Sequence, residues 1–171
     1  PIILHPKFEL KRDRDRVRAY AEALFTGGEE TLWRWARDRG ARYLVLSRGL
    51  FSRARPEYQM RYMADAMNPG PDTAARVLTA RPAEARFFRP VWENSVYRVF
   101  RLVPERIVLR ARQQAAEAAE ALGAGDLARA EACATRSLQW DRRQPLALDI
   151  LRAVERERAR RSADMGHGGN E

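Results

Sequence analysis

The amino-acid sequence predicts an α/β domain, in which a small mixed sheet is flanked by helices, followed by a unit made of helices alone. Three observations support this prediction. Residues 43–46 (YLVL) form an apolar run that does not alternate with polar residues, as expected of a strand covered on both faces. The segment 29–39 before it has helical periodicity and ends at Gly40. From Pro104 onward the composition changes to alanine-rich helical sequence.

The first part of the chain is expected to alternate between strands and helices. Residues 2–4 (IIL) predict a strand beside the run at 43–46. Apolar residues at helical spacing predict a helix over 11–25, and a second helix over 29–39 ends at Gly40 in a left-handed cap. Because all four side chains of 43–46 are large and apolar, we expect this run to be the buried central strand.

After the central run, two further helices and a hairpin are predicted. Pro56, at the first helical position, predicts a helix over 56–67. Asp72 is expected to cap a short helix that runs through Thr79. Residues 86–92 and 95–102 are rich in aromatic and β-branched residues and predict an antiparallel hairpin. Pro90 should place the first of these strands at an edge or a bulge.

The remaining sequence predicts three helices. They are expected over 105–122, over 126–140 with Asp126 as the cap, and over 145–161. The segment 162–171 is expected to be a disordered tail. The predicted organisation is therefore an α/β domain over residues 1–103, a helical unit over 104–161 and a tail over 162–171.

The charge of the chain is unevenly distributed between these parts. The net charge is +9, and arginine supplies most of it. Residues 1–103 hold 20 basic and 12 acidic side chains, a difference of +8. A basic surface can bind nucleic acid or anionic lipid, but basic and acidic residues alternate here, as in KRDRDR at 11–16. We therefore expect a solvated arginine-rich surface and no nucleic-acid partner.

The sequence contains no recognisable catalytic, cofactor-binding or metal-ligating residues, and no small-molecule ligand is predicted. His5 and His167 have no triad or metal-site neighbours in sequence. Ser47 lacks the flanking glycines of a nucleophile elbow, and Gly27-Gly28 lacks a phosphate-loop pattern. Cys133 is the only cysteine, so it excludes an internal disulfide and is expected to be a small buried residue.

The helical part resembles the second half of a tetratricopeptide repeat. The resemblance rests on GDLARA at 125–130, Ala134, Ser137-Leu138 and Asp141, whose small residues let antiparallel helices pack closely. The first half matches less well, since Ala118 and Ala121 replace a glycine and an aromatic residue. The resemblance implies a helical hairpin whose third helix caps it. A generic helical hairpin is the alternative.

Residues 1–102 resemble the soluble region that follows the membrane part of GT-C-type glycosyltransferases, including oligosaccharyltransferase catalytic subunits. The resemblance rests on the order of elements, on PIILHPKFE at 1–9, on GARYLVL at 40–46 and on FRPVWENSVYRVFRL at 88–102. It implies an accessory domain of a larger membrane-embedded protein that is related to glycosyltransferases. The catalytic acidic residues of that family lie between membrane helices, so the resemblance implies a non-catalytic role for this chain.

Three functions are compatible with the sequence. The first is a non-catalytic domain on the extracytoplasmic (periplasmic) face of a bacterial membrane, which contacts proteins through its helical unit. The second is a self-standing, cytoplasmic adaptor of the tetratricopeptide type, which binds a partner segment. The third is a basic nucleic-acid-binding domain, which lacks a recognition motif here. Of these we expect the first.

Overall fold

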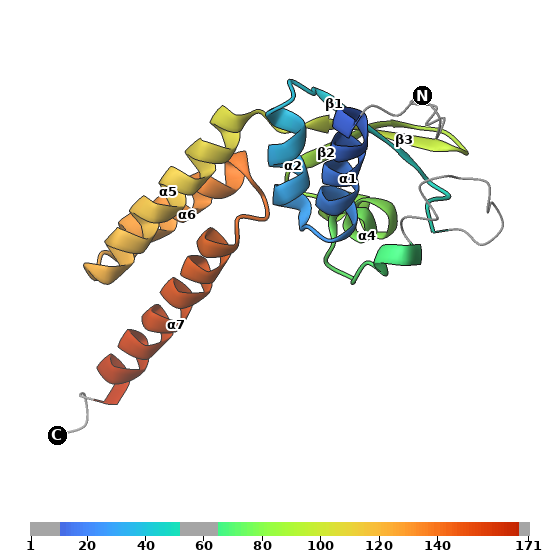
Figure 1. Ribbon diagram of the computed structural model, residues 1–171. Coiled ribbons are helices and arrows are strands. Elements are labelled where there is room, and N and C mark those ends of the chain that lie inside the picture. The colour runs from blue at the N-terminus through green and yellow to red at the C-terminus, as the bar shows by residue number, and fades with distance from the viewer. Residues whose placement is uncertain (1–10, 52–64, 168–171) are drawn as a thin grey trace. The chain divides into compact units, whose positions relative to one another are not determined.

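The computed structural model describes residues 11–51 and 65–167 and divides the chain into two compact units, Pro1–Leu102 and Val103–Glu171 (Figure 1). The predicted strand at 2–4 and most of the predicted helix at 56–67 lie outside the described residues. In the first unit the structure contains helices and strands in the order α1 (Lys11–Phe25), α2 (Glu29–Arg37), β1 (Tyr43–Ser47), α4 (Ala74–Ala80), η1 (Pro82–Glu84), β2 (Phe88–Glu93) and β3 (Tyr97–Leu102).

The three described strands form an antiparallel sheet in the order β1-β3-β2. The expected mixed sheet with residues 43–46 at its centre is therefore wrong for the described part of the chain. The predicted hairpin is confirmed as β2 and β3, and β1 pairs with the free side of β3, which makes β3 the central strand. The register is irregular between Pro90 and Trp92, as the proline predicted.

Only one face of β1 is buried. Leu44 and Leu46 are 8% and 5% exposed, whereas Tyr43 and Val45 are 56% and 55% exposed. The prediction that all four side chains are buried is therefore wrong. A run of apolar residues is found in strands that are buried on both faces and also in strands with one exposed apolar face. The run alone does not distinguish these two arrangements.

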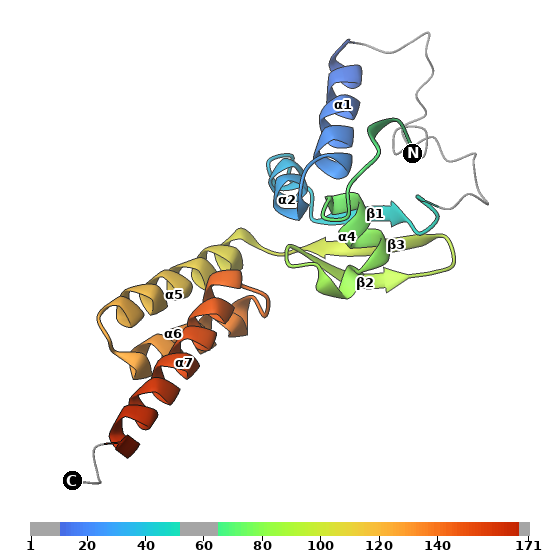
Figure 2. The ribbon, with the colours of Figure 1, turned by 90° about the horizontal axis from the view of Figure 1, so that it is seen from below.

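The buried face of the sheet belongs to the core of the first unit. Figures 1 and 2 show α1, α2 and α4 together on one side of the sheet. Trp33 of α2 packs on Phe87 at 5.3 Å between ring centroids, and Phe88 meets Phe100 edge-on at 6.4 Å. The largest fully buried side chains of this unit are Leu24, Phe25, Leu32, Leu78, Phe88 and Phe100.

Two local boundaries of the first unit were tested by the structure. Gly40 has a φ of +70°, so the predicted left-handed residue after the second helix is confirmed. The expected cap of the fourth helix differs, because α4 begins at Ala74 and Thr73 takes the N-cap position in place of Asp72. The cap and the start of the helix therefore lie one residue later than predicted.

The second unit consists of α5 (Glu105–Gly123), α6 (Leu127–Trp140) and α7 (Pro145–His167). Asp126 accepts a hydrogen bond from the backbone N of Arg129, which confirms it as the cap of α6. The buried Ser137 hydroxyl of α6 donates to the carbonyl of Ala111 in α5 at 2.6 Å. Small side chains dominate the core between the helices, which contains Ala115, Ala118, Ala121, Leu127, Ala130, Cys133, Ala134, Ala147, Ile150 and Val154.

The third helix of this unit is longer than predicted. α7 continues to His167, so the disordered tail expected from residue 162 is wrong for 162–167. Ion pairs and hydrogen bonds between successive turns stabilise the C-terminal part of α7. Arg161 pairs with Glu157 one turn earlier, and the Ser162 hydroxyl donates a hydrogen bond to the carbonyl of Arg158. Such i,i+4 contacts stabilise helix that buries little apolar surface.

Candidate functional site

The face of the sheet opposite the core carries a group of exposed and partly exposed side chains. Directly opposed residues of antiparallel strands point to the same face, so the register assigns the members. They lie in three rows across the strands. We call this surface the open face, and it consists of Tyr43, Arg101 and Arg89 in the first row, Val45, Val99 and Trp92 in the second, and Ser47 and Tyr97 in the third.

The open face is apolar and accessible. Trp92 is 54% exposed and Tyr97 is 43% exposed, in addition to Tyr43 and Val45. Val91, beside the irregularity in β2, is also exposed. Single exposed apolar residues are normal on a protein surface, but a contiguous group on one rigid sheet is typical of a binding surface.

The charged residues of the open face are all basic. Arg89 and Arg101 lie directly opposite each other on neighbouring strands. The only acidic residue in the three described strands is Glu93, which pairs with Arg98 at 2.7 Å. The Arg98 guanidinium also donates to the carbonyls of Leu78 and Thr79 in α4, so this pair lies on the helix-covered face. The hydrogen bond from Arg98 lowers the pKa of Glu93.

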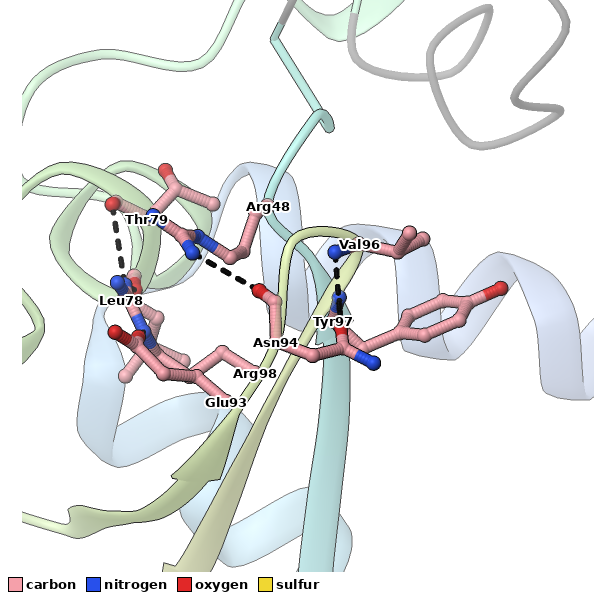
Figure 3. A network of polar contacts seen from close by, with 8 residues as sticks. All are labelled: Arg48, Leu78, Thr79, Glu93, Asn94, Val96, Tyr97 and Arg98. Carbon is pink, nitrogen blue, oxygen red and sulfur yellow. Dashed lines mark hydrogen bonds and ion pairs between the residues drawn. The ribbon is translucent and has the colours of Figure 1, made fainter.

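The turn between β2 and β3 is held by backbone and amide hydrogen bonds (Figure 3). The Asn94 side-chain oxygen accepts from the backbone N of Val96 at 2.8 Å and of Tyr97 at 2.7 Å. Arg48, just after β1, donates from its guanidinium to the Asn94 carbonyl at 2.9 Å and from its backbone N to the Val96 carbonyl at 2.8 Å. These bonds fix the end of the sheet and so the position of Tyr97.

The other end of β2 is attached to α2 through Glu29. Its carboxylate accepts hydrogen bonds from the backbone N of Arg86 at 2.9 Å, of Phe87, and of Phe88 at 3.2 Å. Burial raises the pKa of Glu29, and the three backbone donors offset part of that rise. Glu29 therefore links the first turn of α2 to the start of the hairpin that carries the open face.

Glu29→Ala should destabilise the first unit by about 1–2 kcal/mol, because it leaves several half-buried backbone N–H groups without an acceptor. Glu29→Gln keeps one acceptor oxygen, so it should destabilise the first unit less than Glu29→Ala does. Denaturant titration of the full chain measures both. Glu30→Ala, in the same helical turn, removes the ion pair with the mostly exposed Arg34 and serves as the control. Equal losses for the two alanine variants would contradict this role of Glu29.

A cleft of about 860 Å³ lies along α1 and α2. The Arg39 guanidinium lies 4.3 Å from the centre of the Trp35 ring, and Tyr20 lies 5.1 Å from the same ring. Burial raises the pKa of Tyr20 to about 12, so its hydroxyl stays protonated. Trp35 thus lines a cleft, whereas Trp33 is in the core. The lining residues are Arg16, Val17, Tyr20, Trp35, Asp38 and Arg39.

The candidate residues from the sequence that the structure describes have structural roles. The Ser47 hydroxyl accepts a hydrogen bond from the backbone N of Gly49 at 3.2 Å, as part of a turn. Cys133 is buried in the second unit, as predicted. His5 and the side chain of His167 lie outside the described residues. Within the described residues, no group of three or more His, Cys, Asp or Glu side chains could hold a metal ion.

Sequence reasoning missed the open face, because it assigned Tyr43 and Val45 to the core. The sequence of β3 carried no clear signal either, because outward Tyr97 and Val99 are apolar whereas inward Arg98 is charged. In the described part of the chain, no helix has the length and apolar character needed to cross a bilayer.

Comparison with protein-family models, with curated proteins and with solved structures finds no match to this chain. Its function is therefore inferred from its own residues and their geometry.

Proposed function

We propose that this chain is a non-catalytic soluble domain of a larger, membrane-embedded GT-C-like protein, and that it mediates protein contacts. The observation that carries the contact role is the open face, with four large apolar side chains between 43% and 56% exposed on one face of the sheet. On this proposal the parent protein is related to glycosyltransferases, and the domain lies on the extracytoplasmic side of a bacterial membrane.

The roles of the hairpin residues support the non-catalytic part of this proposal. The resemblance to GT-C proteins rests largely on the segment around Glu93, Asn94 and Arg98. Asn94 closes the turn, and Glu93 and Arg98 pair with each other against α4. Residues with such mutual hydrogen bonds build the hairpin and leave no free acid or base at its tip.

A tetratricopeptide-type helical unit is part of the same proposal. The small residues at the repeat spacing, Ala118, Ala130, Ala134 and Ser137, are all fully buried. Their size allows α5 and α6 to pack closely, as the two helices of such a repeat do. α7 then follows α6 as the first helix of a next repeat would, and covers part of the same core. Helical units of this type bind partner segments, which supports a contact function.

Membrane fractionation of the source cells tests the parent-protein proposal. An antibody against this chain should detect a larger protein that stays in the membrane pellet after alkaline carbonate extraction. Protease added outside spheroplasts should digest the epitope, because the domain is placed on the extracytoplasmic side. A protein recovered entirely in the soluble fraction would contradict the proposal and favour the self-standing adaptor.

A further inference from the structure

We propose that the open face docks an acidic, apolar segment of a separate partner protein, whose carboxylates pair with Arg89 and Arg101. This inference deepens the proposed contact function and rests on it. It names the chemistry of the partner and the rows of the sheet that recognise each part.

The arginine pair supplies the argument for acidic groups. Arg89 and Arg101 face each other across two hydrogen-bonded strands, an arrangement that is unfavourable between like charges. No acidic residue of the described strands shares their face, since Glu93 belongs to the opposite one. A carboxylate bound between them would relieve this repulsion and form charge-assisted hydrogen bonds with the guanidinium groups.

The second row supplies the apolar part of the recognition. Val45, Val99 and Trp92 lie side by side across all three strands, next to the arginine row. Successive rows on one face are two residues apart, or about 7 Å along a strand. An extended partner segment would therefore place an apolar side chain over the second row and a carboxylate two residues away, over Arg89 and Arg101.

The same rows disfavour two other occupants. A second copy of the chain would bring the same arginines, and residues 1–103 carry 20 basic against 12 acidic side chains. Long-range repulsion would oppose that association. Single-stranded RNA stacks its bases on aromatic rings that lie close together. On the open face the three aromatic residues lie in three different rows, and two of the three residues in the middle row are Val45 and Val99. An acidic polypeptide fits both rows.

Site-specific photo-crosslinking in the source cells tests this inference on the natural full-length protein. The photoreactive residue p-benzoylphenylalanine replaces Val45 in one variant and Trp92 in another, and crosslinked peptides are identified by mass spectrometry. We expect both positions to crosslink one partner protein, at a segment with Asp or Glu two residues from the attachment point. Replacement of Leu146, an exposed apolar residue of α7, is the matched control and should not crosslink that segment.

Charge reversal separates specific docking from general contact. Arg89→Glu combined with Arg101→Glu should lower the crosslink yield about tenfold, because like charges then oppose each other across the interface. Arg89→Lys combined with Arg101→Lys should retain most of the yield, and melting of both purified variants reports on their folding. Crosslinking to RNA, to another copy, to the parent chain or to a basic segment would overturn the inference, and so would the absence of crosslinks.

The outcome is independent of the membrane test. An acidic partner crosslinked to a protein that fractionates as soluble would retain this inference and reject the GT-C-like parent. A membrane-embedded parent without a crosslink to an acidic segment would retain the GT-C-like parent and reject this inference.

Discussion

Phe100→Ala should lower the unfolding free energy of the first unit by about 3–5 kcal/mol, the usual cost of truncating a fully buried phenylalanine. Phe100 has no exposed surface and lies in the central strand, with Phe88 edge-on to it at 6.4 Å. Its loss would leave a cavity that the sheet cannot close, because β3 is held by hydrogen bonds on both sides. Guanidinium titration followed by tryptophan fluorescence measures the loss.

Val45→Ala and Val45→Asp are the controls for this prediction. Val45 is more than half exposed on β1, so its truncation should change stability by about 0.5 kcal/mol or less. The aspartate variant should remain folded, because the carboxylate would stay in water. If Val45→Asp unfolded the unit, the run at 43–46 would be buried on both faces after all.

Ala130→Leu should destabilise the second unit by about 3 kcal/mol, the upper range for overpacking, because it adds three carbon atoms at a fully buried position. Ala130 lies in α6, in the small-residue core shared with α5 and α7. The substitution would force the helices apart and disturb the bond from the Ser137 hydroxyl to Ala111. Hydrogen exchange of the α6 amides in the full chain should accelerate accordingly.

Ala132→Leu is the matched control in the same helix. Ala132 is exposed, and leucine and alanine are both good helix formers. The change should therefore lower the unfolding free energy by about 0.3 kcal/mol or less. Equal exchange rates for the two variants would mean that α6 tolerates a large residue at its contact with α5. The close packing expected of a tetratricopeptide-type pair would then be wrong.

Features of the fold that depend on a few adjacent residues were predictable from sequence. Gly40 adopts its left-handed conformation, Asp126 caps α6, and the hairpin forms around Asn94. In each case the physical cause is local: a φ that favours glycine, a side-chain acceptor for a free N–H, and a turn closed by an amide. Local chemistry therefore located most helices and the hairpin.

The candidate site could not be predicted in the same way, because it depends on long-range pairing. Residues 43–46 are equally apolar on both faces, and Tyr43 and Val45 are exposed because the helices lie on the opposite side of the sheet (Figures 1 and 2). The opposition of Arg89 and Arg101 likewise follows from the strand register, which includes an irregularity after Pro90. Residues 12 apart in sequence become neighbours only through that register.

Cysteine labelling tests the central claim, that the sheet has an open face which a partner covers. Val45→Cys and Leu46→Cys are made in a Cys133→Ser background, which removes the one native thiol. In the isolated chain, the maleimide reaction should be fast for Val45→Cys and slow for Leu46→Cys, which is 5% exposed. In the natural protein within its cells, Val45→Cys should become protected. Slow labelling of both variants in the isolated chain, or fast labelling of Val45→Cys in the cells, would contradict the account.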